Sequence, residues 1–249
     1  MTPLSFGFDP DDVLVVTGAG SGIGRAATLA AARQGLRVVA WDLDAGAVAG
    51  TAGLVDAEVG PGRVRTQTGD VADVAAVGTA LDGVAGSWAP PRYLANNAGP
   101  SSAGDLSFDE GIVASLGSVH SMTEAWAAVA SSTAAAMVVT ASVAGTKVGT
   151  ESAWYSAAKA GLAGYVRHLA AHHADRFRSN AVAPGMVDTP RLAGWAASEA
   201  GQRAIARNPL HRMAEPTDIA HALLFLLSPA AAYVNGEVLT VDGGWTVTQ

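Results

Sequence analysis

The alternation of short apolar runs with longer alanine-rich stretches most constrains how this chain can fold. The apolar runs, typical of strands buried on both faces of a sheet, cover residues 13–17, 36–41, 64–67, 93–96, 136–141, 180–182 and 238–241. Stretches with helical patterning lie between them, for instance at 25–34, 74–84, 108–130, 156–173 and 217–227. Strands alternating with helices predict parallel strands joined by helical crossovers. We therefore predict an α/β fold, a single Rossmann-type domain over residues 1–249 with a doubly wound parallel sheet of about seven strands.

Composition excludes several other classes of protein. The 249 residues are 49% hydrophobic and 15% charged, which is typical of a globular chain. The net charge is -7, and basic residues do not cluster, so no nucleic-acid partner is expected. Without cysteine the chain has no disulfide, thiolate nucleophile or cysteine-bound metal. Residues 1–12 do not resemble a signal peptide and no apolar run is long enough for a bilayer, so we expect a soluble cytoplasmic protein with no membrane partner.

A glycine-rich turn follows the first predicted strand. It reads Thr17-Gly18-Ala19-Gly20-Ser21-Gly22-Ile23-Gly24 and leads directly into a predicted helix. Gly18 and Gly22 can adopt backbone angles denied to other residues and let the main chain approach a pyrophosphate, while the helix N-terminus attracts the anion. Gly24 would let helix and strand pack closely. The pattern favours dinucleotide binding by Gly18, Ser21, Gly22 and Ile23, and a plain tight turn is the alternative.

An acidic residue ends the second predicted strand. Asp42 stands where a carboxylate can accept hydrogen bonds from both hydroxyls of the adenosine ribose, and it would repel a 2′-phosphate. The neighbouring Ser21 and Trp41 carry no charge that could offset this repulsion. We therefore expect NAD rather than NADP as the cofactor, with Asp44 as an alternative for the role of Asp42.

Three side chains have the chemistry to move a proton. Ser142 follows a predicted buried strand, and Tyr155 and Lys159 stand four positions apart, which places them on one face of a helix. A nearby ammonium favours the phenolate and lowers the pKa of a tyrosine, so Tyr155 can act as a general acid or base. Ser142 would hydrogen-bond the substrate oxygen. Alone, such a tyrosine and lysine pair is more often structural than catalytic.

Six separate segments in the same order identify a resemblance. The sequence resembles the short-chain dehydrogenase/reductase family over essentially its whole length, in Thr17 to Gly24, Asp70-Val71, Asn96-Asn97-Ala98-Gly99, Ser142 with Tyr155 and Lys159, Pro184-Gly185 with Thr189, and Val241-Asp242-Gly243-Gly244. The resemblance implies an NAD-dependent enzyme that acts on CH-OH groups, converting a secondary alcohol to a ketone and back by transfer of the pro-S hydride. It also implies a variable substrate loop at about 186–213.

Further residue roles come from the resemblance alone. It implies that Asp70 and Val71 lie against the adenine, and that Lys159 also binds the nicotinamide ribose. Val187 and Thr189 would contact the nicotinamide carboxamide. The remaining implied cofactor contacts are Asn97, Ala98, Gly99, Tyr155, Pro184 and Gly185. For segment 96–99 a purely structural role is an equal alternative, because amide side chains satisfy buried backbone groups.

One position departs from the family pattern. The family has an asparagine in the helix after segment 96–99, where it holds a water that connects the lysine to solvent. The matching position here is Ser115, which is shorter but can still donate and accept. We include Ser115 among the candidate catalytic residues. The departure leaves open a relay through another water, slower proton exchange, or a non-catalytic binding protein descended from an enzyme, such as one that senses nucleotides.

The expected substrate pocket is largely apolar and favours a neutral alcohol or ketone. Only Lys147 and Arg191 could bind an acid there. The expected lining is Pro100, Ser101, Val143, Ala144, Val148, Trp154, Met186, Leu192 and Trp195, where both tryptophans have a core or interface role as the alternative. A family enzyme acting on a C=C or C=N bond is the other catalytic alternative. His120, His172, His173 and His211 show no metal-ligand pattern, and no metal is expected.

The helix that begins near Ser156 is rich in alanine and glycine, so another helix can approach it closely. By resemblance this helix pairs with the one containing Ser115 across a two-fold axis, and the C-terminal strand makes a second contact. A homotetramer is therefore expected, with a homodimer as the alternative.

Overall fold

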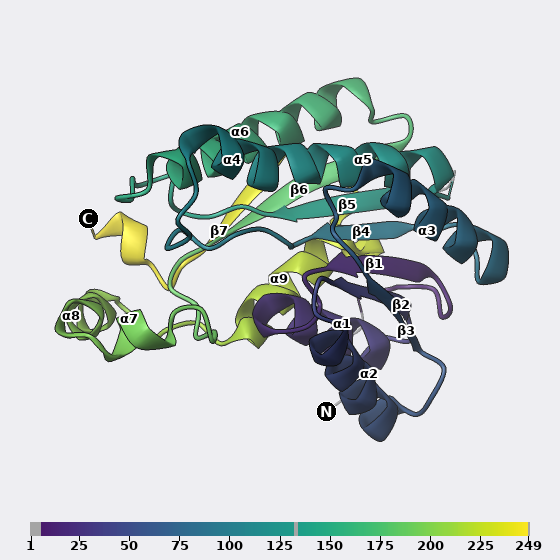
Figure 1. Ribbon diagram of the computed structural model, residues 1–249, viewed down its shortest axis with the longest axis horizontal. Coiled ribbons are helices and arrows are strands. Elements are labelled where there is room, and N and C mark those ends of the chain that lie inside the picture. Colours follow the sequence, from purple (N-terminus) through teal and green to yellow (C-terminus); the bar gives the residue numbers. More distant parts are fainter. Residues whose placement is uncertain (1–5, 132–133, 249) are drawn as a thin grey trace.

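The chain forms one seven-stranded parallel sheet. In the computed structural model, residues 6–131 and 134–248 are described. The strands are β1 (Val13–Thr17), β2 (Arg37–Asp42), β3 (Val64–Thr68), β4 (Tyr93–Asn96), β5 (Ala135–Thr140), β6 (Phe177–Pro184) and β7 (Val238–Val241). They lie in the order β3-β2-β1-β4-β5-β6-β7, as Figure 1 shows. The predicted doubly wound sheet is confirmed.

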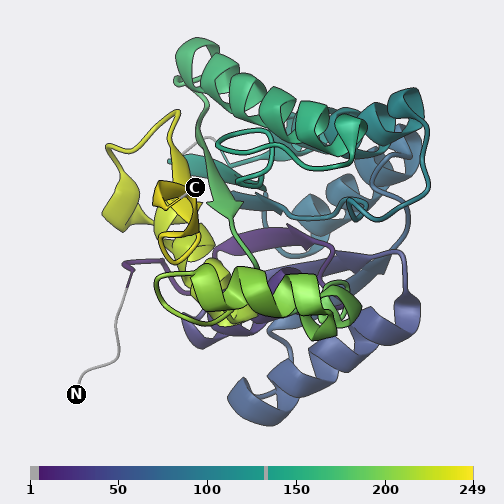
Figure 2. The same cartoon turned by 90° about the vertical axis from the view of Figure 1, so that its left-hand side faces the viewer.

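Helices cover both faces of the sheet. Their bounds are α1 (Gly22–Arg33), α2 (Ala45–Val59), α3 (Val74–Ser87), α4 (Phe108–Ile112), α5 (Ser118–Val129), α6 (Ala153–His172), α7 (Ala193–Ala197), α8 (Glu199–Arg207) and α9 (Pro216–Leu227). Helices α1, α2 and α9 lie on one face, and α3 to α6 lie on the other (Figures 1 and 2). Helices α7 and α8 stand apart from the sheet at its carboxyl edge and form half of segment 186–213.

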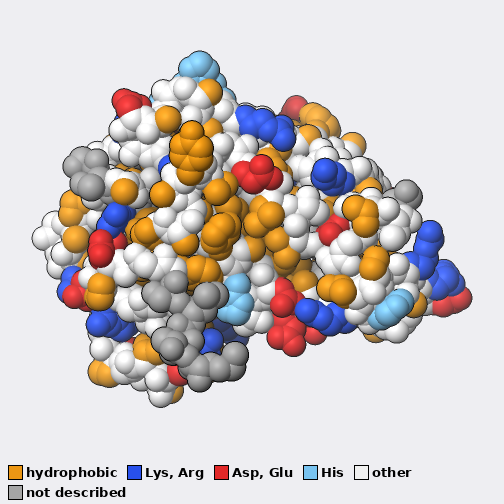
Figure 3. All heavy atoms as spheres, turned by 180° about the vertical axis from the view of Figure 1, so that it is seen from behind, with side chains coloured by type: hydrophobic (Ala, Val, Ile, Leu, Met, Phe, Trp, Pro, Cys, Tyr) orange, Lys and Arg blue, Asp and Glu red, His pale blue; other side chains and the backbone are white. Residues whose placement is uncertain are grey.

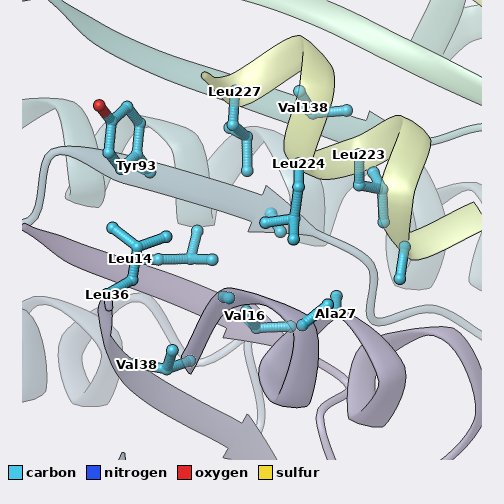
Figure 4. Packing of buried hydrophobic residues seen from close by; sticks show 14 of the residues in the cluster. Leu14, Val16, Ala27, Leu36, Val38, Tyr93, Val138, Leu223, Leu224 and Leu227 are labelled. Atoms are coloured by element: carbon cyan, nitrogen blue, oxygen red, sulfur yellow. The ribbon is translucent and has the colours of Figure 1, made fainter. Parts of the chain in front are cut away.

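Alternation along β1 divides the core between the two faces. Leu14 and Val16 pack toward α1 and α9, where they meet Leu223 and Leu224 (Figure 4). Val13 and Val15 belong to the cluster on the other face, together with side chains of α3, α5 and α6. Successive side chains of a strand point to opposite faces, so a continuous apolar run is required for a strand covered on both sides.

The chain reverses its direction of travel across the sheet at β1. Strands β2 and β3 lie on one side of β1, and β4 to β7 lie on the other. In such sheets a crevice opens beyond the carboxyl ends of the strands at the point of reversal. The turns after β1, β4, β5 and β6 therefore meet at one edge, which positions the candidate site.

The predicted single helix over 108–130 is interrupted. A π-helical turn, Val113–Gly117, separates α4 from α5. Gly111 and Gly117 lower the helix propensity around this turn. The Ser118 hydroxyl donates a hydrogen bond of 2.7 Å to the Ala114 carbonyl, so this carbonyl has a partner within the irregular turn. Such π-turns are rare and often lie at functional sites.

Charges are dispersed on the face shown in Figure 3. Lysine and arginine side chains alternate there with aspartate and glutamate, and hydrophobic side chains gather toward the middle. Among the helices of the described ranges, none combines the length and apolar character needed to cross a bilayer.

Candidate active site

The glycine-rich turn brings the backbone of β1 and α1 into close contact. Gly18 has a φ of +68°, in the left-handed region that favours glycine. A Cβ on Gly24 would lie 2.1 Å from the carbonyl oxygen of Gly18, so no larger residue fits. The Ser21 side chain does not cap α1. The first amides of the helix therefore remain available beside the cavity that Ser21, Gly22 and Ile23 line.

Asp42 is held in a fixed orientation at the end of β2. Its Oδ2 accepts a hydrogen bond from the Gly20 amide at 2.7 Å, and its Oδ1 accepts one from the Asp44 amide at 3.1 Å. The Asp44 carboxylate is used differently, because it caps α2 by accepting from the Ala47 amide at 3.0 Å. Asp42 lines the outer part of the cleft and Asp44 does not line it, which favours Asp42 over the alternative.

Ser142 and Tyr155 lie together at the inner end of the cleft. The Ser142 Oγ accepts a hydrogen bond from the Ala144 amide at 3.1 Å, which leaves its own proton free to donate. Burial raises the pKa of Tyr155, while the hydrogen bond with the Ser142 side chain and the charge of Arg191 act to lower it. The protein alone thus holds Tyr155 protonated, and a lowered pKa requires a further positive charge.

Lys159 is the buried cation of the site. Its Nζ donates to the carbonyl oxygen of Thr140 at 2.8 Å and lies 5.5 Å from the centre of the Tyr155 ring. Burial lowers the pKa of Lys159 to about 8, and the charge of Arg191 acts in the same direction. One of three donors is used by Thr140, so the ammonium retains donors for a ligand.

The two asparagines of segment 96–99 serve different purposes. Asn97 donates to the carbonyl of Thr17 at 3.1 Å and accepts from the Thr140 hydroxyl at 3.0 Å, which ties the ends of β1, β4 and β5 together. Asn97 also lines the inner cleft. Asn96 points the other way, because its amide donates to Thr123 of α5 at 3.0 Å. The structural reading therefore applies to Asn96, whereas Asn97 both ties the strand ends together and lines the cleft.

One continuous cleft collects nearly all the residues predicted from the sequence. Its inner half is lined by Gly18, Ser21, Gly22, Ile23, Asn97, Gly99, Ser142, Tyr155, Lys159, Pro184, Gly185, Val187 and Thr189 among others. Its outer half is lined by Gly18, Asp42, Asp70, Val71, Ala98 and Gly99 among others. The two halves share Gly18, Gly99, Pro100 and Arg191, which line both of them.

Ser115 lies outside this lining. It is buried in the π-helical turn, and its Oγ has no hydrogen-bond partner within the described part of the chain. Its position next to Ala114, which lines the outer cleft, keeps it near the site.

Part of the expected substrate lining differs from the structure. Pro100, Ser101 and Leu192 line the inner cleft as expected. Trp154 does not, because its indole packs on Gly111, where a Cβ would lie 2.3 Å from the ring. Trp195 is 38% exposed and also lies outside the lining. The remaining expected residues, Val143, Ala144, Val148 and Met186, are not part of the lining either.

Sequence reasoning missed several residues of the cleft. Thr140, Ser102 and Pro190 line the inner half, and Leu43, Leu106 and Ala114 line the outer half. Leu43 directly follows Asp42, and Thr140 stands two positions before Ser142, so closeness to these residues at strand ends was the available signal. Leu106 and Ala114 come from the segment after β4, and no signal in the sequence indicated their place in the cleft.

The cleft fits a nicotinamide dinucleotide. The amides at the start of α1 and the close approach of Gly24 to Gly18 form a cradle for phosphate oxygens. Asp42 is oriented for ribose hydroxyls at one end, and Lys159 retains donors for the other ribose. Val187 and Thr189 border the inner end, where the Thr189 methyl would be 3.1 Å from a Cβ on Gly22.

Comparisons with known proteins agree with this geometry. A family model described as enoyl-(acyl carrier protein) reductase matches residues 18–246. The chain is 37% identical over 247 residues to cis-4-hydroxycyclohexanecarboxylate dehydrogenase of Sinomonas cyclohexanicum, covering 94% of this chain and 96% of that protein. It is 31% identical over 245 residues to cyclohexanol dehydrogenase of Acinetobacter sp. (strain SE19), covering 94% of each.

A solved structure shows the same fold. The short-chain dehydrogenase/reductase of Brucella melitensis, described as a glucose/ribitol dehydrogenase, superimposes with a TM-score of 0.90 at 27% identity and covers 97% of this chain and 99% of that one. The fold and the cleft define an oxidoreductase that uses a nicotinamide cofactor and acts on a small molecule. The chain belongs to the short-chain dehydrogenase/reductase family.

Proposed function

We propose that this protein interconverts a secondary alcohol and its ketone with NAD(H). The observation that carries the proposal is the convergence of Ser142, Tyr155 and Lys159 on the same cavity as the glycine-rich turn. Proton transfer and hydride transfer can therefore take place side by side. A nucleotide-sensing protein would need the turn and Asp42 but not these three side chains.

Tyr155 acts as the general acid and base. When a ketone is reduced, the Tyr155 phenol gives its proton to the carbonyl oxygen and becomes the phenolate. When an alcohol is oxidised, the Tyr155 phenolate takes the proton of the substrate hydroxyl and becomes the phenol. Ser142 donates a hydrogen bond to the same substrate oxygen and holds it within reach of the phenol. A nicotinamide held in this cleft would supply the hydride acceptor or donor for the substrate carbon, and the positive charge of its oxidised form would favour the Tyr155 phenolate.

Lys159 supports Tyr155 and returns the proton toward solvent. Its ammonium lies close enough to the phenol to stabilise the phenolate, and the Thr140 carbonyl fixes its position. The buried Ser115 Oγ, which lacks a protein partner among the described residues, is suited to hold a water molecule. We propose that this water passes the proton from Lys159, in place of the asparagine that the family carries.

Asp42 makes NAD the preferred cofactor. Its carboxylate is fixed by two backbone amides, so it cannot turn away from a 2′-phosphate. The adjacent Leu43 is 70% exposed and carries no charge. A 2′-phosphate would therefore be repelled by the Asp42 carboxylate, and residues 41–44 include no arginine or lysine to offset this repulsion.

The substrate is a secondary alcohol on a largely apolar, cyclic skeleton. Pro100 and Leu192 supply apolar surface beside Tyr155, and Ser101 with Ser102 adds hydroxyls. Two similar proteins bear names that specify cyclohexane-ring alcohols. We infer that segment 186–213, with α7 and α8, closes over this ring.

Assembly and location are further parts of the proposal. Ala160 and Gly164 on α6 are exposed, and a Cβ on Gly164 would meet nothing within 4 Å. Such a surface lets a second helix approach closely, which supports a homotetramer or homodimer. We expect the protein in the cytoplasm, with no nucleic-acid or membrane partner.

The test is turnover followed by reduced-nicotinamide absorbance. Cyclohexanol and cyclohexanone are offered with NAD(H) and separately with NADP(H), and wild type is compared with Tyr155→Phe. The variant should lose about 10²–10⁴-fold in kcat. Tyr165→Phe, on the same helix but outside the cleft lining, is the matched control and should retain activity. Cofactor binding without turnover on any alcohol or ketone, or on a C=C or C=N substrate, would instead favour a nucleotide sensor.

A further inference from the structure

Arg191 spans the cleft between its two halves. Its Nη1 donates a hydrogen bond of 2.8 Å to the carbonyl oxygen of Gly99, which follows β4. Arg191 itself follows Thr189 and Pro190, at the start of the segment that leads to α7. The inner and outer halves share Arg191 as a lining residue, together with Gly18, Gly99 and Pro100. The guanidinium therefore lies where a bound dinucleotide must pass from one half to the other.

This guanidinium has no acidic partner among the described residues. Ion pairs within 4.0 Å join carboxylates to the arginines at positions 33, 37, 63, 92, 203 and 212, and Arg191 is one of the arginines without such a pair. Among those unpaired arginines of the described residues, Arg191 alone lines the cleft, and its hydrogen bond goes to a neutral backbone carbonyl. A guanidinium has five N–H donors in a planar fork, and hydrogen bonds to an oxyanion are roughly twice as strong as those to a neutral acceptor. An anion in reach would displace the Gly99 carbonyl.

The charge of Arg191 reaches the groups that move the proton. Burial raises the pKa of Tyr155 and lowers the pKa of Lys159, and the charge of Arg191 acts to lower the pKa of both groups, as expected of a cation close to the inner cleft. No acidic side chain lines the inner half of the cleft, as far as the described residues go, so nothing there compensates this charge. Arg191 and Lys159 together make the cleft positive between the glycine-rich turn and Tyr155.

We propose that Arg191 is an anion-binding residue of the active-site cleft, held on the Gly99 carbonyl until an oxyanion of the cofactor or of the substrate replaces that carbonyl. The two sources share one chemistry, because a pyrophosphate and a substrate carboxylate both accept from the guanidinium fork. The inference rests on the proposed function, and it corrects the expected neutral substrate if the carboxylate is the source.

Binding measurements test the proposal without relying on turnover. NADH affinity is measured by fluorescence titration, and the affinity of cyclohexanecarboxylate for the NADH complex is measured by calorimetry. Both are compared among wild type, Arg191→Gln and Arg191→Lys. Arg65→Gln removes the same charge by the same substitution at an exposed position that does not line the cleft, and it is the matched control.

If the pyrophosphate is the anion, Arg191→Gln should weaken NADH binding by about tenfold or more, with a smaller loss for Arg191→Lys. If the substrate carboxylate is the anion, NADH binding should be unchanged and cyclohexanecarboxylate binding should fall by a similar factor. In either case added salt should weaken the affected binding more in wild type than in Arg191→Gln.

Unchanged affinity for both ligands in Arg191→Gln would overturn the proposal. An equal loss in Arg191→Gln and Arg191→Lys with no difference in salt dependence would also overturn it, because it would indicate that the Gly99 bond only positions the loop. Turnover of cyclohexanol with normal binding in Arg191→Gln would sink this inference and leave the proposed function standing. Altered ligand binding in Arg191→Gln, in a protein that shows no turnover, would support the inference on Arg191 and contradict the proposed function.

Discussion

The Nζ of Lys159 donates a hydrogen bond to the carbonyl oxygen of Thr140, at the end of the neighbouring strand β5, at a distance of 2.8 Å. This bond fixes a buried ammonium between the sheet and Tyr155. The burial of that ammonium makes the free energy of unfolding depend on pH.

Burial lowers the pKa of Lys159 from 10.5 to about 8 in the folded protein. Between these two values the unfolded chain binds more protons than the folded one, so this residue makes stability rise with pH through that window and fall as pH drops through about 8. Lys159→Met should lose this rise, which amounts to on the order of 3 kcal/mol. Urea unfolding of both proteins across the window measures it, and parallel curves would contradict the prediction.

Asp42 and Asp44 offer a matched pair for cofactor choice. Asp42→Ala should weaken NAD binding and raise the affinity for NADP relative to NAD by about tenfold or more, because a carboxylate that accepts from ribose hydroxyls is removed. Asp44→Ala removes a helix cap and should cost about 1 kcal/mol of stability with the NAD to NADP ratio unchanged. Titration of each variant with both cofactors decides between them. If only Asp44→Ala changed the ratio of NAD to NADP affinity, Asp44 and not Asp42 would be the residue that selects the cofactor.

Variants at Ser115 and Ser118 distinguish a role in proton transfer from a role in helix packing. Both serines are buried, but the Ser118 hydroxyl is bonded to the Ala114 carbonyl and the Ser115 hydroxyl has no partner within the described residues. Ser115→Ala should lower kcat by about tenfold with little change in cofactor affinity, since general acid and base assistance of this kind contributes 10²–10⁴-fold when fully lost. It should also change the solvent isotope effect on kcat. Ser118→Ala should leave both readouts unchanged, and equal behaviour of the two variants would argue against a relay.

Gly24 and Gly53 are helical glycines with opposite surroundings. A Cβ at Gly24 would lie 2.1 Å from the Gly18 carbonyl, whereas a Cβ at Gly53 would meet nothing within 4 Å. Gly24→Ala should lower the free energy of unfolding by about 1–3 kcal/mol and abolish tight NADH binding. Gly53→Ala should raise stability by about 0.5–1 kcal/mol, since alanine favours the helix. Urea unfolding and NADH fluorescence give both quantities, and normal NADH binding by Gly24→Ala would show that the turn tolerates a side chain.

The sheet and most of the cleft could be predicted because their signals are local. The apolar run 13–17 and the glycines after it define a buried strand that turns sharply into a helix, and this pairing is visible without any tertiary information. The carboxyl ends of parallel strands then necessarily meet at one edge. That is why Asp42 and Ser142 could be placed at this edge from their positions at strand ends, whereas the roles of Asn97 and Thr189 came from the family resemblance.

The missed features depend on contacts between distant segments. The helical patterning of 108–130 gave no sign of the π-helical turn, which accompanies close packing of α4 on α6. Trp154 was expected to line the cleft as part of the segment that follows Ser142, with a core role as the alternative, and its ring fills the space that Gly111 leaves open. The bond between Arg191 and Gly99 joins residues 92 positions apart, and no spacing rule could have indicated it.

The packing of Trp154 on Gly111 also limits how this active site can evolve. The indole occupies a notch that exists only because residue 111 has no side chain, and Trp154 is bonded covalently to Tyr155. The depth at which the tyrosine-bearing end of α6 sits against α4 is thus set by a residue that never touches the substrate. Substitutions in the segment around α7 and α8 can change the range of substrates, whereas position 111 must stay glycine for the Tyr155 phenol to keep its place.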